Sequence, residues 1–285
     1  MPANTWNFRS VRELRRAHVE AVVEVDFGAG PHRMTPWTTA LDLRAVVPAT
    51  GPVDWAELDR LPNLSTVSWS GADRGLAEAV ARHPQIQYLE WFDAEGDLDL
   101  RQTATVRLWI NCTRVTSLLL PATMITLLLQ GPHEGLRVET QDQRYGMGLH
   151  LQTGGAEVVV PAGLRETPVV RLNLGGELSV TALEPFTNLR ELTLDFEAPP
   201  GRLTDLSLFA QHPGLFQLCL INAYDVDPAP LPDLPFLSSV ELIGTRAEIA
   251  ERLRERFTGR ARPEVTVRYA RPSGNQGAAA PVESP

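Results

Sequence analysis

The sequence contains no lysine, so every strongly basic side chain is an arginine. A phosphate-binding loop of the G-x-x-x-x-G-K-[ST] kind is therefore excluded, because that motif requires a lysine. Cysteine is also scarce, with only Cys112 and Cys219 in 285 residues. Two cysteines cannot form a disulfide framework, and both lie in strand-like segments. We predict that both are reduced thiols packed in the core.

Long apolar runs are absent as well. The longest candidate, residues 115–129, is interrupted by polar residues and a proline, and it is shorter than the roughly 18–20 apolar residues that cross a bilayer. The first residues lack a basic patch followed by an apolar core, so no signal peptide is predicted. We expect a cytoplasmic protein that does not bind membranes.

Positive charge is in the minority, and the formal net charge at pH 7 is −9. An acidic chain is poorly suited to bind the phosphate backbone of a nucleic acid, so we expect no nucleic-acid partner. The same balance leaves room for a basic protein partner. The apolar fraction of 43% is typical of a soluble globular protein that can fill a core.

Motifs that carry catalysis are missing too. Gly28-Ala-Gly30 lacks the third glycine of a dinucleotide loop, because Arg33 stands in its place. The histidines show no metal-ligand spacing, and no G-x-S-x-G motif marks a nucleophile. The acidic pair Asp93 and Glu95 is predicted to lie in a loop, where solvated carboxylates are common. We therefore predict no catalytic residue, no cofactor, no metal site, and a protein that is not an enzyme.

What the sequence does contain is a recurring phrase of the form L-x-x-L-x-L. Its copies start 22 residues apart (64 to 86), 26 apart (189 to 215) and 22 apart (215 to 237), and four of the five follow a proline. Self-similarity at this period predicts a stacked repeat with one strand in each unit. His83 and His212 precede that proline in two copies, which indicates a role in a turn. The copies begin at Leu64, Ile86, Leu189, Leu215 and Leu237.

Other elements surround these copies. Residues 76–82 favour a helix and residues 204–211 a short helix or 3₁₀ turn, while capping boxes at 10–13 and 245–248 each predict a helix start. Strands are expected at 23–27, 41–43 and 265–269. Between 100 and 182, strand-like pieces recur every 9 to 14 residues and no helix fits. Either strands occupy two sides of each repeat there, or part is antiparallel, with Gly154-Gly155 as a hairpin turn.

The repeat copies resemble the leucine-rich repeat family over roughly 55–110 and 165–245. The resemblance implies an α/β right-handed solenoid, with short helices or turns on the convex side and a strand-rich middle. It also implies an N-terminal cap at 1–54, a solenoid at 55–244, and a capping helix and strand at 245–270. The composition of residues 271–285, which have little to bury, predicts a disordered tail. The family's asparagine after each strand is missing, so the repeats are of an irregular, bacterial type. Its positions hold Ala72, Ala94, Glu197, Ala223 and Thr245.

In that family the residues between the strand leucines point outward and form a binding surface. Arg107, Trp109 and Asn111 join this outward set, because they alternate with Leu108 and Ile110. By position, the other outward residues are Thr66, Ser68, Ser70, Tyr88, Glu90, Phe92, Arg171, Asn173, Glu191, Thr193, Asp195, Gln217, Cys219, Ile221, Ser239, Glu241 and Ile243. The candidate partner-binding residues are Tyr88, Glu90, Phe92, Arg107, Trp109, Asn111, Arg171, Asn173, Glu191 and Asp195.

Two functions are compatible with this pattern. The first is a monomeric, non-catalytic module that binds another protein through its strand face, with Tyr88, Phe92 and Trp109 as a hot spot; the alternative for these aromatics is that the N-terminal cap packs on them. The second function is a parallel β-helix that binds or acts on a carbohydrate. Helices at 76–82 and 204–211 favour the first function, and strands on two or three sides throughout favour the second.

Overall fold

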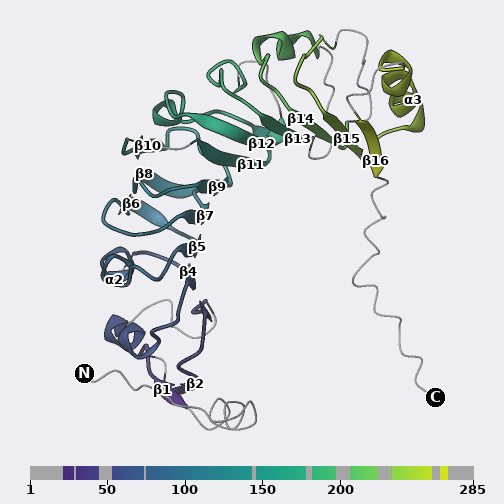
Figure 1. Ribbon diagram of the computed structural model, residues 1–285. Helices are drawn as coiled ribbons and strands as arrows, with labels where there is room; N and C mark the ends of the chain where they lie inside the picture. Colours follow the sequence, from purple (N-terminus) through teal and green to yellow (C-terminus); the bar gives the residue numbers. More distant parts are fainter. Residues whose placement is uncertain are drawn as a thin grey trace, which may run out of the picture. The chain divides into compact units, whose positions relative to one another are not determined.

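The computed structural model describes residues 22–28, 30–44, 53–73, 75–142, 146–177, 182–196, 206–223, 231, 233–258 and 264–268 (Figure 1). The fold is α/β, with mostly parallel strands and few helices. It divides into two compact units, Met1–Gln152 with Val159–Pro168, and Thr153–Val158 with Val169–Pro285. The predicted capping box at 10–13 and the predicted tail at 271–285 lie outside the described residues.

The larger sheet of the first unit is parallel. Its strands are, in spatial order, β3 (Ala40–Asp42), β4 (Thr66–Ser70), β5 (Tyr88–Phe92), β7 (Arg107–Asn111), β9 (Thr126–Gln130) and the first part of β11 (Met147–Glu157). The register aligns the apolar positions of the repeat: Trp69 lies beside Trp91, and Trp91 beside Ile110. All three side chains are buried, which confirms the predicted inward positions of the phrase.

A second parallel sheet occupies another layer of this unit. It is formed by β6 (Glu95–Asp99), β8 (Arg114–Leu120) and β10 (Arg137–Thr140), and Figure 1 shows it apart from β5, β7 and β9. Leu98, Leu118 and Val138 align across it and are buried. Strands in this part of the chain therefore form two separate sheets, in agreement with the alternative that placed strands on two sides of each repeat. Gly154 and Gly155 lie inside β11 rather than between two strands.

A short antiparallel ladder joins β1 (Val23–Val25) to β2 (His32–Met34). The sequence pattern predicted a strand at 23–27 but gave no sign of its partner. Val25 and Phe27 are buried, and Phe27 lies against Trp55, with 6.4 Å between the ring centroids. This small ladder therefore contributes to the core at the start of the described chain.

One hydrogen-bonded turn recurs ahead of the strands. In each case the N–H of a buried apolar residue donates to the carbonyl three residues earlier, as for Ile86 to His83 (2.9 Å) and Leu215 to His212 (3.0 Å). The same bond joins Leu136 to His133 (3.2 Å), so a third histidine occupies this position. The turn role predicted for His83 and His212 is confirmed. Further copies end at Leu64, Met124, Leu164 and Leu237.

The helices are short. They are η1 (Trp55–Arg60), α2 (Leu76–Arg82), η2 (Ala162–Leu164), η4 (Leu206–Gln211) and α3 (Ala247–Arg256), so both predicted mid-chain helices are present, η4 as a 3₁₀ helix. The prediction that a capping box at 245–248 starts a helix was wrong about the cap. Arg246 precedes α3 without a side-chain cap, and the buried Thr245 hydroxyl has no hydrogen-bond partner. No helix in the described ranges is long and apolar enough to cross a membrane.

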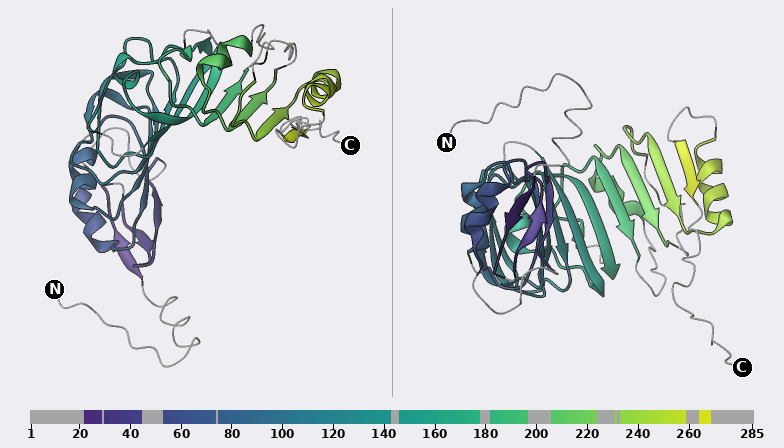
Figure 2. Two further views of the ribbon diagram at one scale, coloured as in Figure 1. Left: turned by 45° about the horizontal axis from the view of Figure 1, so that its top comes forward. Right: turned by 90° about the horizontal axis from the view of Figure 1, so that it is seen from below.

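The sheet of the second unit is parallel as well (Figure 2). It contains β12 (Val169–Glu177), β13 (Glu191–Asp195), β14 (Gln217–Ile221), β15 (Ser239–Ile243) and β16 (Glu264–Arg268) in chain order. The register aligns Leu172, Leu192, Leu218 and Val240, which are all buried. Within the described residues β16 pairs with β15 alone and β3 pairs with β4 alone, so neither this sheet nor that of the first unit closes on itself.

Two tryptophan indoles bond the turn that follows β4. The Nε1–H of Trp69 donates to the Ala72 carbonyl (3.0 Å), and that of Trp91 donates to the Gly71 carbonyl (2.8 Å). Gly71 has φ of +106°, a backbone conformation that side-chain-bearing residues rarely adopt. Trp69 and Trp91 therefore both fill the core and bond the turn after β4.

Both cysteines are free and buried. Burial raises the pKa of the Cys112 thiol to about 11, and it is the main cause of a pKa of about 11 for Cys219 as well. A thiol with so high a pKa is almost fully protonated at neutral pH and is a poor nucleophile. The prediction of packed thiols is confirmed.

Candidate partner-binding surface

Six of the ten candidate residues lie on two neighbouring strands of the first unit. Tyr88 and Glu90 on β5 are in register with Arg107 and Trp109 on β7. Because side chains alternate along a strand, these residues share the face opposite the core. Tyr88 is 37% exposed and Trp109 is 36% exposed, while Phe92 is half-buried. The structure therefore brings the predicted aromatics onto one surface.

The aromatic rings hold one another in place. The Phe92 and Trp109 ring centroids lie 5.5 Å apart, with the planes at 60°. The Trp109 indole N–H donates to the Gln130 side-chain oxygen (3.1 Å), and the Arg107 guanidinium lies 5.3 Å from the Tyr88 ring centroid. Tilted ring pairs and cation–π contacts of this kind are favourable. We call Tyr88, Glu90, Phe92, Arg107 and Trp109 the aromatic patch.

The N-terminal region covers part of this patch. Arg44, just after β3, places its guanidinium 4.6 Å from the Phe92 ring centroid. Arg44 also forms an ion pair with Asp42 (2.6 Å), and the hydrogen bond from Arg44 lowers the pKa of Asp42. Packing by Arg44 thus accounts for part of the burial of Phe92, but Tyr88 and Trp109 remain exposed.

The patch carries one charge of each sign next to its rings. Arg107 forms no ion pair with any carboxylate of the described residues. Glu90 accepts a hydrogen bond from the Ser68 hydroxyl (2.7 Å). Ser68 is itself buried, so its assignment to the accessible surface was wrong: it shares the outward face but neighbouring side chains cover it.

Asn111, the sixth residue of this set, has a local role. Its side-chain oxygen accepts bonds from the backbone N–H of Thr113 (3.2 Å) and from the Thr113 hydroxyl (2.8 Å). It is half-buried at the end of β7. These bonds stabilise the turn after the strand and use the amide oxygen of Asn111, whose register partner on β9 is Gln130.

The remaining four candidates lie in the second unit, where two of them bond to each other. The Arg171 guanidinium on β12 donates two hydrogen bonds to the Glu191 carboxylate on β13, from Nε to Oε2 (2.5 Å) and from Nη2 to Oε1 (2.9 Å). Asp195 accepts a hydrogen bond from the Asn222 amide (3.0 Å). Asn173 is half-buried and is in register with Thr193. No aromatic side chain stands among these four residues.

Cys219 also lies on this face of the second unit. It was predicted to be part of the accessible surface, and it is buried instead. Its register neighbours are Thr193 and Glu241, and the longer side chains around it exclude solvent from the small thiol. The prediction of its face was right and that of its accessibility was wrong.

Two carboxyl groups of β13, those of Glu191 and Asp195, are expected to change the free energy of unfolding with pH in opposite directions. The hydrogen bond from Arg171 lowers the pKa of Glu191 below its ordinary 4.5, so its contribution is present above that value and is lost as pH falls through the folded-state pKa. Burial raises the pKa of Asp195 above 3.8, although Asn222 acts in the opposite direction. Ionised Asp195 therefore opposes folding at neutral pH, and this cost disappears as pH falls.

Glu191→Gln is accordingly expected to lower the melting temperature at pH 7, whereas Asp195→Asn raises it modestly. Both differences from the wild-type protein should shrink as the pH is lowered through the respective folded-state pKa. Thermal unfolding of the three proteins between pH 7 and pH 3 measures this. A uniform offset at every pH would contradict the assigned causes.

Sequence reasoning missed two contributors to the aromatic patch. Gln130 follows the alternation of Leu127 and Leu129 on β9, so the strand period could have placed it on the outward face. Arg44 carries no such signal, because it lies in a turn and reaches Phe92 only through the folded chain. Within the described ranges, no group of three or more His, Cys, Asp or Glu side chains is placed to hold a metal ion.

Comparison with known proteins adds no family to this picture. No protein-family model matches the chain, and a search of curated proteins found no match.

Proposed function

We propose that the protein is a non-catalytic binding module, a solenoid of the leucine-rich-repeat kind, whose protein partner docks on the aromatic patch. The observation that carries this proposal is the exposed pair Tyr88 and Trp109, fixed in place by Arg107, Phe92 and Gln130. Tyrosine, tryptophan and arginine are the residues most enriched at the energetic centres of protein interfaces.

The rigidity of the patch supports this function. A partner that binds a mobile side chain must first immobilise it, at an entropic cost of about 0.5–1.5 kcal/mol for each side chain. Trp109 is already held by a ring contact and a hydrogen bond, so much of that cost has been met in the folded protein. A preformed aromatic surface therefore favours tight docking.

Charge narrows the choice of partner. The net charge of −9 favours the approach of a basic protein over that of a nucleic acid. Within the patch, Glu90 offers a carboxylate to an incoming lysine or arginine, and Arg107 offers a guanidinium to an incoming carboxylate. A partner that presents an apolar or aromatic side chain flanked by charged groups matches this arrangement.

Carbohydrate binding is the second candidate. The Gln130 amide bonds the Trp109 indole, and an aromatic ring next to an amide group suits the apolar face and hydroxyl groups of a sugar. The second sheet of β6, β8 and β10 also agrees with the multi-sided strands expected of a β-helix. α2 and η4 favour the leucine-rich-repeat proposal.

Trp109→Ala and Tyr88→Ala are expected to weaken partner binding about 30-fold each, as hot-spot truncations do. Both side chains are partly exposed, so the variants should still fold, with a smaller loss of stability than truncation of a fully buried aromatic side chain would cause. Immobilised wild-type and variant proteins are compared for the proteins that they capture, and affinities are then measured with the captured partner. A glycan array probed with the same proteins tests the second candidate.

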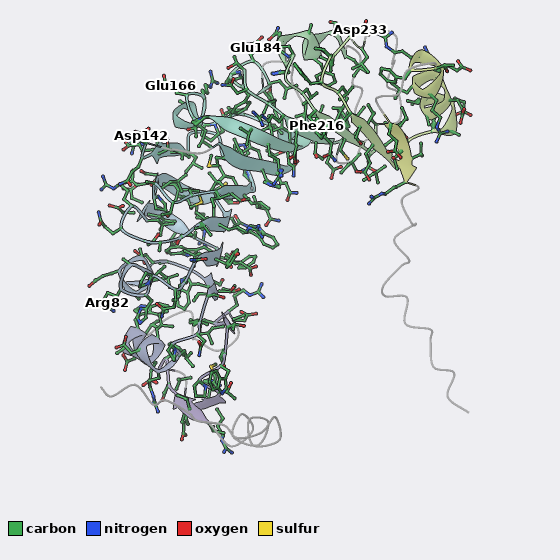
Figure 3. All side chains as sticks on the ribbon, viewed as in Figure 1. Arg82, Asp142, Glu166, Glu184, Phe216 and Asp233 are labelled. Atoms are coloured by element: carbon green, nitrogen blue, oxygen red, sulfur yellow. The ribbon has the colours of Figure 1, made fainter. Side chains whose placement is uncertain are left out.

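Phe216→Ala provides a matched control. Phe216 lies just before β14, is labelled in Figure 3, and is 49% exposed outside the aromatic patch. Its loss should leave binding unchanged. If the Trp109 and Tyr88 variants unfold, the rings belong to the core and the docking proposal fails. Glycan binding that depends on Trp109, without any protein bound, would replace the proposal with the second candidate.

A further inference from the structure

The sheet of the second unit has an open edge at β16. Within the described residues β16 pairs only with β15. Its core-facing side chains, Val265 and Val267, are only half-buried, although their register partners Val240 and Leu242 are completely buried. α3 packs against β16, but the last apolar row of the sheet is left incompletely covered.

Among the described residues, the backbone of β16 is also paired on one side only. The N–H of Glu264 donates to the Ser238 carbonyl (2.9 Å), and the N–H of Gly244 donates to the Arg268 carbonyl (3.2 Å). Backbone groups of a strand point alternately to its two sides, so Glu264, Thr266 and Arg268 bond β15. The N–H and C=O groups of Val265 and Val267 therefore point toward the open edge.

We propose that two copies of this chain associate through antiparallel pairing of β16 with β16 about a two-fold axis at Thr266. When identical edges meet across a two-fold axis perpendicular to the sheet, the strands run antiparallel. The sequence Glu264-Val-Thr-Val-Arg268 is self-complementary in that arrangement. Val265 opposes Val267 of the second copy, and Glu264 opposes Arg268 of the second copy.

Hydrogen bonding is compatible with this register. In an antiparallel ladder, pairs that exchange two N–H···O bonds alternate with pairs that exchange none. Centring on Thr266 makes both Val265–Val267 pairs the bonded ones, and these residues hold the free backbone groups. A shift by one residue would direct backbone groups already bonded to β15 toward the second copy.

Charge favours the pairing as well. Glu264 is exposed and forms no ion pair within the described residues. Arg268 contacts Glu241 (2.7 Å) yet its side chain is 70% exposed, and a guanidinium has enough N–H groups for a second carboxylate. On the apolar face, the half-buried valines of the two copies meet and exclude water. Pairing thus gives partners to the free backbone groups of β16, brings Glu264 next to Arg268 of the second copy and covers the half-buried valines. It yields a dimer, whereas the sequence led us to expect a monomer.

Sedimentation or light scattering over a range of protein concentrations tests the proposal on the full chain. Wild-type protein is expected to give a concentration-dependent dimer. Glu264→Arg places like charges opposite each other at both ends of the ladder and should weaken the dimer about tenfold or more. The double variant Glu264→Arg with Arg268→Glu restores opposite charges across the two-fold axis and should restore dimerisation.

A pair of proline variants tests the backbone side of the proposal. Val265→Pro removes an N–H that points to the open edge, so the ladder to β15 and the melting temperature should be retained while the dimer is lost. Thr266→Pro removes an N–H that bonds β15 and should lower the melting temperature. Monomeric mass at every concentration overturns the proposal, as does a wild-type dimer that survives in folded Val265→Pro or Glu264→Arg protein.

Discussion

Replacing Trp91 with alanine is expected to lower the free energy of unfolding by about 3–5 kcal/mol. Trp91 is completely buried on β5, in register with Trp69 on β4 and Ile110 on β7. Truncation leaves a large cavity in the centre of the first unit. It also removes the indole N–H that bonds the Gly71 carbonyl (2.8 Å). Urea or thermal unfolding of the purified variant measures the loss.

Two other variants separate the causes of this effect. Trp91→Phe keeps most of the ring but not the N–H, and should cost about 1–2 kcal/mol from the smaller ring and the lost bond. Trp109→Ala removes the same side chain from the partly exposed face of the next strand, and should cost clearly less than Trp91→Ala because Trp109 is 36% exposed. Equal costs for Trp91→Ala and Trp109→Ala would contradict the assignment of one ring to the core and the other to the surface.

The contrast between Trp91 and Trp109 was predictable from the strand period. In the phrase beginning at Ile86, Leu89 and Trp91 hold the apolar positions, and Tyr88 and Phe92 fall on the other face. Period 2 along a strand fixes this division without knowledge of the neighbours. Parallel stacking at a repeat period of 22 residues then aligns equivalent positions, as the register of Val67 with Leu89 shows.

Features that depend on distant neighbours were not predictable in this way. Ser68 and Cys219 occupy outward positions but are buried, because surrounding side chains determine accessibility. Thr245 has the sequence of a helix cap, yet its hydroxyl has no partner, because α3 begins after Arg246. The sheet of β6, β8 and β10 was only one of two alternatives, since short apolar runs do not reveal with which strand they pair.

The candidate surface was predicted in part for the same reason. Strand alternation placed Tyr88, Phe92 and Trp109 on one face, and their mutual contact follows from the register of β5 and β7. That Arg171 and Glu191 would bind each other could be read only from the register of β12 and β13. Charged residues on neighbouring strands are candidates for a partner until the register shows whether they face each other.

Gly163→Ala is the second change expected to have a large effect, with a loss of about 3 kcal/mol in the free energy of unfolding. Gly163 lies in η2, in the copy of the recurring turn that precedes the buried Leu164. A Cβ atom there would lie 1.6 Å from the Val138 carbonyl oxygen on β10. Because the obstacle is backbone, no side-chain rotation relieves the overlap, and η2 must move away from the sheet.

Gly214→Ala is the matched control, because Gly214 occupies the equivalent position in the turn from His212 to Leu215. Its added Cβ would lie 3.7 Å from the Leu189 carbonyl oxygen, an ordinary contact. Neither glycine has the positive φ that would strain an alanine, so the two substitutions differ only in the space available. Gly214→Ala should therefore be neutral or stabilise by about 0.4–1 kcal/mol, through the lower entropy of the unfolded chain. If the two substitutions change the free energy of unfolding in opposite directions, contact with β10, and not turn conformation, requires the glycine at 163. Equal changes would refute that explanation.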